Sequence, residues 1–217
     1  MIQLQLNRGS ENSLSVLCLG SHSDDIEIGC GGTILKLAEK YPASEFHWLV
    51  FSATGVRGAE AQRGAQLFTA SARLRGPQLK SFPDSFMPFA GAEVKNVFEH
   101  LKQTISPDLI FTHNSNDAHQ DHRLIAELTW NTFRDHLILE YEIPKYDGDL
   151  GHPSFFVLLD NEVCQKKVRY IMDVFQSQHS KSWFHESTFL SLMRLRGLEC
   201  NAPSGYAEAF HCRKIVL

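Results

Sequence analysis

The chain has 217 residues, a length that suits one domain with a full hydrophobic core, so we expect a single domain over residues 1–217. Its hydrophobic share of 43% and charged share of 21% argue against disordered, collagen-like and disulfide-dense classes. The net charge of -4 comes without a block of Lys and Arg, which argues against a nucleic-acid partner. Because no apolar run is long enough for a membrane helix and the first residues lack a signal-peptide pattern, we expect a soluble, cytoplasmic protein.

The first half of the chain reads as a strand, helix, strand unit. The apolar run 15–20 predicts a buried strand, and the helical apolar spacing of 34–41 predicts a helix that follows two glycines and stops at Pro42. A second buried strand is expected at 46–51, with a loop after it.

The pattern continues towards the C-terminus. The remaining expected helices are 59–74, ended by Gly76-Pro77, 92–105, 121–136, 163–175 and 183–199. The remaining expected strands are 108–112, 137–143 and, at the end of the chain, 211–217.

Alternating strands and helices predict an α/β fold, a Rossmann-like three-layer sandwich with a largely parallel central sheet and right-handed crossovers. In such sheets ligands bind outside the carboxyl ends of the strands. Two clusters of His and Asp directly follow expected strands, at 22–25 and 119–122, so we expect both at the ligand-binding edge.

The first cluster is His22, Ser23, Asp24 and Asp25. If a turn sends Asp25 to a metal ion, it leaves Asp24 facing the substrate side. Ser and Asp are also favoured in turns and at helix N-caps, so this cluster alone leaves metal binding and capping open.

The second cluster contains His119, Asp121 and His122, with His113, Asn116 and Asp117 upstream. Residues 119 and 122 are three apart, so both imidazoles can lie on one side of a first helical turn. Asp121 can either cap that helix or bind an imidazole. Two such clusters at the ends of neighbouring strands favour a shared metal site over two helix caps.

The ligand types favour zinc or another transition metal. Imidazoles argue against calcium and magnesium, which take mainly oxygen ligands. A structural zinc site is usually rich in thiolates, and the five cysteines lack that spacing. Three protein ligands of the His, Asp, His type and an open position are typical of a reactive zinc site.

These clusters resemble the motifs of the zinc-dependent deacetylase family that includes the PIG-L (GlcNAc-phosphatidylinositol) de-N-acetylases and the LmbE-like proteins. Its first motif, a strand followed by His-Pro-Asp-Asp and Gly-Gly-Thr, is similar to SHSDDIEIGCGGT at 21–33. Its second motif, His-Pro-Asp-His at a helix start, is similar to AHQDHR at 118–123, although Ser23 and Gln120 replace the prolines. Weaker similarities extend over nearly the whole chain: Arg63, FPD at 82–84, SQ at 177–178 and YAEAF at 206–210.

The resemblance implies one Zn²⁺ per chain, held by His22, Asp25 and His122. It implies Asp24 as the general base that activates water for attack on an amide carbonyl, and a protonated His119 as the group that stabilises the oxyanion. Acetate and a free amino sugar are then the products.

Three further roles are expected beside the zinc ligands. Asp121 either orients a neighbouring histidine or caps its helix. Arg57 is a candidate substrate contact, as are Asp84, for which the start of a turn is the alternative, and Arg63, for which a solvated helix face is the alternative. The expected partner is a small N-acetylated sugar, and a homo-oligomer is compatible with the sequence.

Two other classes remain open. One is a non-catalytic Rossmann-like domain that binds a nucleotide or nucleotide sugar through GCGGT at 29–33, although the glycines do not form the GxGxxG pattern. The other is a silent family member that binds without turnover, against which Asp24 and His119 argue because a metal scaffold needs neither.

Overall fold

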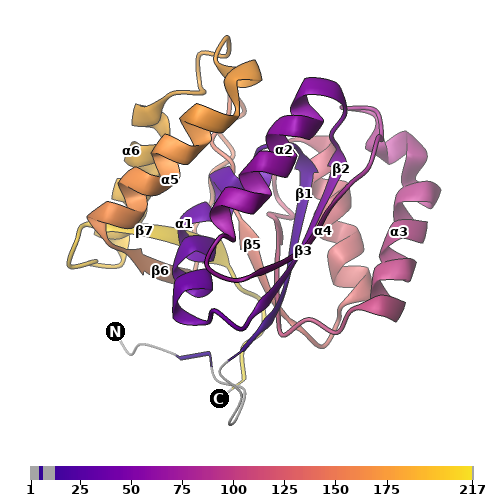
Figure 1. The fold of residues 1–217 in the computed structure, drawn as a ribbon, viewed down its shortest axis with the longest axis horizontal. Helices are drawn as coiled ribbons and strands as arrows, with labels where there is room; N and C mark the ends of the chain where they lie inside the picture. Colours follow the sequence, from indigo (N-terminus) through magenta and orange to yellow (C-terminus); the bar gives the residue numbers. More distant parts are fainter. Residues whose placement is uncertain (1–4, 7–12, 217) are drawn as a thin grey trace.

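The computed structural model describes residues 5–6 and 13–216, so most of the N-terminal stretch considered for a signal peptide and the last residue of the expected terminal strand lie outside the described residues. The described chain forms a seven-stranded sheet in the order β3-β2-β1-β4-β5-β7-β6 (Figure 1). Its strands are β1 (Ser15–His22), β2 (Glu45–Ser52), β3 (Arg73–Leu79), β4 (Leu109–His113), β5 (Leu137–Tyr141), β6 (Phe155–Leu159) and β7 (Tyr206–His211).

The strands β1 to β5 are parallel, and β7 runs antiparallel to both of its neighbours. The chain proceeds from β1 outward to β3 and then returns to place β4 on the other side of β1. The junction between β1 and β4 is therefore a topological switch point, where the loops leaving two adjacent strands separate and leave room for a ligand.

Helices cover both faces of the sheet (Figure 1). One face carries α1 (Asp25–Lys40), α2 (Gly55–Phe68), α5 (Asn161–Val174) and α6 (Glu186–Glu199), and the other carries α3 (Gly91–Thr104) and α4 (Gln120–Thr132). Two short 3-10 helices, η1 (Met87–Ala90) and η2 (Gln176–Gln178), lie in connections.

Successive side chains of a strand point to opposite faces of the sheet, so the strands contribute to a hydrophobic core on each face. In β1, Val16 and Cys18 belong to the core beneath α1, α2 and α5, whereas Leu17 and Leu19 belong to the core beneath α3 and α4. A strand buried on both faces has no polar side, and β1 accordingly reads as a continuous apolar run. The predicted α/β fold with a largely parallel sheet is confirmed.

Several elements differ from the sequence-based expectation. Helix α1 begins at Asp25, with the glycines inside it, and α2 ends at Phe68. Residues 73–79, partly assigned to the preceding helix, form the edge strand β3, and the expected terminal strand at 211–217 is replaced by β7 at 206–211. Strand β6 was not expected. Edge strands such as β3 pair on one side only, so they tolerate the Pro and the charges that weaken a strand pattern.

Among the residues that the structure describes, no helix has the length and apolar character needed to span a bilayer.

Candidate functional site

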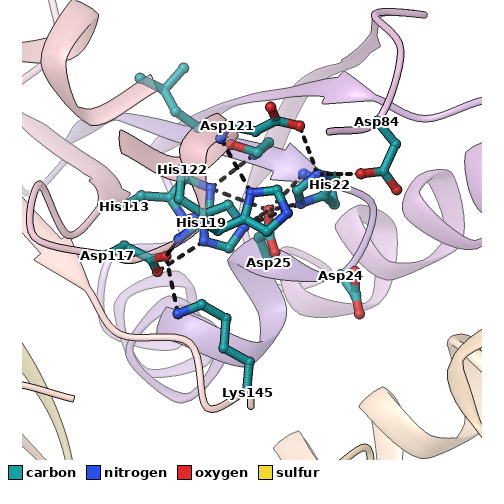
Figure 2. A network of polar contacts seen from close by, with 12 residues as sticks. His22, Asp24, Asp25, Asp84, His113, Asp117, His119, Asp121, His122 and Lys145 are labelled. Carbon is teal, nitrogen blue, oxygen red and sulfur yellow. Dashed lines mark hydrogen bonds and ion pairs between the residues drawn. The ribbon is translucent and has the colours of Figure 1, made fainter. Parts of the chain in front are cut away.

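Three side chains from the two predicted clusters meet at the switch point (Figure 2). His22 ends β1, Asp25 begins α1, and His122 lies in the first turn of α4. The Nδ1 of His22 is 3.2 Å from the Nε2 of His122 and 3.4 Å from the Oδ2 of Asp25, and the last two atoms are 3.6 Å apart. Ligand atoms around a tetrahedral zinc ion with bonds of about 2.0–2.1 Å lie about 3.3–3.4 Å from one another. The three atoms therefore have the mutual spacing that a zinc ion requires.

Local structure explains why His22, Asp25 and His122 lie close together. Strands β1 and β4 pair in parallel, so the helices that follow them begin at the same edge of the sheet. The backbone N–H of His22 donates to the Oδ2 of Asp25 at 2.6 Å, which fixes the tight turn between strand and helix. All three side chains are buried, so the arrangement is held by the fold.

The charges suit a cation. The pKa of Asp25 lies well below its ordinary value because, against the effect of burial, His122, His113 and His22 favour the carboxylate. Burial and His113 lower the pKa of His122, which favours the neutral imidazole that binds metals. His22 has a raised pKa, since Asp25, Asp121 and Asp84 outweigh the effect of burial. A metal at Nδ1 must therefore displace a proton from His22.

A buried carboxylate orients His122. Its Nδ1 lies 2.9 Å from the Oδ2 of Asp117, whose Oδ1 is 3.0 Å from the Nζ of Lys145 (Figure 2). The pKa of Asp117 is lowered because, against the effect of burial, the hydrogen bond with His122 and the nearby ammonium of Lys145 favour the carboxylate. A carboxylate that accepts from Nδ1 leaves the Nε2 lone pair of His122 free for a metal.

Asp121 has a different partner from the one its sequence position suggests. Its Oδ2 is 3.3 Å from the Nε2 of His22, and its two oxygens also accept from the backbone N–H groups of Ser85 at 2.7 Å and Met87 at 3.2 Å. The helix cap is His119, whose Nδ1 accepts from the N–H of Asp121 at 3.2 Å. Of the two expected roles, Asp121 thus has the imidazole contact, with the histidine of the other cluster.

Asp24 occupies the N-cap position of α1, yet its side chain makes no capping hydrogen bond. It is only 4% exposed, and the Nη2 of Arg57 lies 3.8 Å from its Oδ1. Burial and the neighbouring Asp25 raise its pKa, against the opposing effect of Arg57. The fold therefore leaves Asp24 as a carboxyl group of raised proton affinity next to Asp25 and Arg57.

His119 stacks on His122, with ring centroids 4.6 Å apart. Burial, His122 and His22 lower its pKa, which favours a neutral ring. Because its Nδ1 accepts a backbone hydrogen bond, the proton of the neutral ring is on Nε2. The sequence argument expected a protonated His119, whereas the structure favours a neutral imidazole with one N–H to donate.

Two of the three candidate substrate residues reach the site. The Nη1 of Arg57 is 3.0 Å from the Oδ2 of Asp84, whose Oδ1 is 3.1 Å from the Nε2 of His22. Arg63 is exposed on α2, and among the described residues no polar contact of the site involves it. The solvated helix face, the alternative considered for Arg63, is what the structure has.

His113 is a site residue to which the sequence argument gave no role. It is fully buried at the end of β4, stacks on His122 with centroids 3.9 Å apart, and places Nε2 3.2 Å from the Oδ2 of Asp25. It could replace His22 in a ligand set with Asp25 and His122. However, its Nε2 accepts from the backbone N–H of Ser21 at 2.9 Å, which occupies that lone pair and favours His22 as the ligand.

The fold and the site define a Rossmann-like α/β protein with a candidate metal centre of His and Asp at the switch point. The family model described as PIG-L: GlcNAc-PI de-N-acetylase matches residues 17–133, more than half of the chain and both clusters. The chain belongs to the PIG-L family.

Solved structures share this fold. The N,N'-diacetylchitobiose deacetylase from Pyrococcus horikoshii has 20% sequence identity and a TM-score of 0.71, over 92% of this chain and 83% of that one. The conserved protein TT1542 from Thermus thermophilus has 20% identity and a TM-score of 0.72, over 94% and 96%. GalB, the 4-carboxy-2-hydroxymuconate hydratase from Pseudomonas putida, has 16% identity and a TM-score of 0.69, over 94% and 98%.

Proposed function

We propose that this chain is a zinc-dependent N-deacetylase that removes the acetyl group from an amino sugar or a sugar conjugate. The observation that carries the proposal is the buried triangle of His22 Nδ1, Asp25 Oδ2 and His122 Nε2, with edges of 3.2 to 3.6 Å. Membership of the PIG-L family supports the reaction class. A zinc ion held by these atoms supplies a Lewis acid that acidifies water and polarises the amide carbonyl.

Asp24 is the proposed general base. Its carboxylate takes a proton from the attacking water and returns it to the nitrogen of the leaving amino sugar. A base works best when its pKa approaches the working pH, and burial beside Asp25 raises the pKa of Asp24 in that direction. Its freedom from helix capping supports this role.

His119 is the proposed oxyanion donor. As the substrate carbonyl becomes tetrahedral, its oxygen gains negative charge, and the Nε2–H of a neutral His119 can donate to it. Loss of one such donor costs about 3–4 kcal/mol in enzymes where it has been removed. The backbone hydrogen bond to Nδ1 supports the role, because it holds the tautomer that carries the proton on Nε2.

Arg57 and Asp84 are the proposed substrate contacts. Their ion pair borders the face of the site on which Asp24 lies, and both side chains are partly exposed. Guanidinium and carboxylate groups in this position can donate to and accept from sugar hydroxyls.

The test is metal analysis of the purified protein beside acetate release from a panel of N-acetylated amino sugars. We expect about one zinc per chain and turnover that stops on chelation and returns with zinc. The variant His122→Ala should lose both metal and turnover, while His100→Ala, an exposed histidine on α3, should keep both. Acetate release that survives complete chelation would contradict the proposal.

The panel should include other reactions. GalB shows that a protein of this fold can be a hydratase, so hydration of an unsaturated tricarboxylic acid is assayed in parallel. Nucleotide binding without metal would favour the non-catalytic Rossmann-like class. Zinc without acetate release across the panel would favour a family member that binds without turnover.

A further inference from the structure

Helix α1, which carries Asp25 in its first turn, is interrupted. Cys30 has φ of −141° and ψ of 15°, outside the helical region, so a short first turn is separated from the longer remainder of the helix. An interruption of this kind leaves backbone groups without their i to i−4 partners. Those groups are buried here and need other partners.

A buried ion pair occupies the break. A regular helix would join the Gly32 N–H to the Ile28 carbonyl. Instead, the Gly32 N–H donates to the Oε1 of Glu208 at 2.8 Å, and the Ile28 carbonyl accepts from the Nζ of Lys167 at 2.6 Å. The Nζ is 2.6 Å from the Oε1, and the other carboxylate oxygen accepts from the Thr33 N–H at 2.6 Å. The ion pair is thus inserted into one hydrogen bond of α1.

The two charges of the ion pair are placed favourably for both segments of α1. The carboxylate of Glu208 lies at the N-terminus of the second segment, and the ammonium of Lys167 lies at the carbonyl end of the first turn, as the helix dipole favours. Both side chains are about 3% exposed. The free energy lost when two charges are removed from water offsets much of their mutual attraction, so a buried ion pair adds little to the stability of the fold. We therefore look for a positional role for Lys167 and Glu208.

The first turn of α1 is seated beside the metal centre. A Cβ added to Gly29, at the end of that turn, would lie 2.2 Å from the ring of Tyr141, so only glycine permits this approach. The Tyr141 hydroxyl donates to the Leu19 carbonyl of β1 at 2.6 Å. The direction of the turn is therefore fixed between the strand ends on one side and the ion pair on the other.

We propose that Lys167 and Glu208 are a positioning pair for the metal centre, which hold the break in α1 and thereby direct Asp24 and Asp25 into the site. They come from α5 and β7, both of which contact α1 (Figure 1). The inference rests on the proposed function only in taking the site to bind zinc. Acetate release is not needed to test it.

The experiment measures zinc affinity by competition with a chromophoric chelator, with thermal unfolding recorded for each variant. Glu208→Gln removes the charge and one of the acceptors while keeping the shape. Leu101→Ala, a buried residue of α3 on the other face, is the control for lost stability alone. We expect Glu208→Gln to bind zinc at least about tenfold more weakly than the wild type, the range seen when groups that orient metal ligands are changed. Leu101→Ala should lower the Tm yet keep zinc affinity within about twofold of the wild type.

Folded Glu208→Gln with wild-type zinc affinity would overturn the proposal, as would an equal loss of affinity in Leu101→Ala. If Glu208→Gln is not folded at the assay temperature, Lys167→Arg replaces it under the same criterion, because it keeps both charges and shifts only the donor atoms. A wild type that binds zinc without releasing acetate refutes the deacetylase and leaves this comparison intact.

Discussion

Asp24 and Asp25 are adjacent in sequence but have different surroundings. Asp25 faces three imidazoles that hold its pKa low, whereas Asp24 is buried beside a like charge that raises its pKa. When the surroundings of two neighbouring carboxyl groups move their pKa values apart, the two groups can take different roles in a reaction. Here the low-pKa group suits a cation, and the high-pKa group suits proton transfer.

The variant Asp24→Asn should retain zinc and lose turnover by about 10²- to 10⁴-fold, since an amide cannot accept the proton of water. Metal analysis and kcat for acetate release give the two readings. Asp25→Asn is the matched variant and should lose zinc as well. Turnover near the wild-type rate in Asp24→Asn would remove this residue from the mechanism.

Asp117 should control zinc affinity without contacting the ion. The variant Asp117→Asn loses the charge that pairs with Lys145 and orients His122, and we expect zinc affinity to fall about 10- to 100-fold. Asp147→Asn is the control, because Asp147 lies 4.0 Å from the same ammonium but is exposed. Equal zinc affinity in the two variants would show that the contact with His122 does not matter.

The sequence predicted the two clusters at one edge of the sheet but not the pairing of their members. Asp121 contacts His22, 99 residues away, and Asp117 is the residue that contacts His122. The spacing of Asp117, five residues before His122, could have suggested a contact within one loop. The role of Lys145 depends on the position of β5 beside β4, which the local pattern does not contain.

At the level of elements, Asp121 ties α4 to the connection between β3 and α3. Its carboxylate accepts from the backbone of Ser85 and Met87, which hold Asp84 against His22. One helix residue therefore positions a loop from the other side of β1. The candidate substrate contact at Asp84 depends on that loop.

The variant Asp121→Ala should release this loop. We expect faster hydrogen exchange of the Ser85 and Met87 amides and a KM raised about tenfold, with a smaller loss of zinc, because a buried N–H that loses its acceptor costs about 1–3 kcal/mol. Thr129→Val on the same helix removes a buried hydroxyl that bonds Thr112, and it should leave those amides unchanged. Unaltered exchange in Asp121→Ala would show that the loop is held by other contacts.

Strands that are buried on both faces of the sheet could be predicted from the sequence, whereas the strands at the edges of the sheet could not. The continuous apolar runs of β1 and β2 gave clear strands, whereas β3 and β6, the two edge strands, were missed or merged into a neighbour. The start of α1 was misplaced for another reason. Glycines usually weaken a helix, and those of α1 are retained because Tyr141, Phe68 and Leu159 pack against the backbone there.

At the scale of the whole molecule, a titratable side chain without a polar partner among the described residues lies inside the core. Glu27 lies in the same turn as Asp25, is fully buried, and has no hydrogen-bond partner at either carboxylate oxygen among the described residues. Burial raises its pKa well above the ordinary value, so the folded state keeps a proton that the unfolded state releases.

This difference makes stability depend on pH with a definite sign. Between the unfolded pKa of about 4.3 and the raised folded pKa, the native state binds one more proton than the unfolded state, so the free energy of unfolding falls by about 1.4 kcal/mol per pH unit. Glu27→Gln removes this contribution. Denaturant unfolding with a chelator present, at pH values from about 4.5 to 7, should therefore show a smaller loss of stability with rising pH in Glu27→Gln than in the wild type. Glu39→Gln, on the exposed end of α1, should follow the wild-type curve. Parallel curves for all three proteins would mean that the buried carboxyl group has partners in solution, and that the core beneath the candidate metal centre contains more water than the packing of α1 and α2 implies.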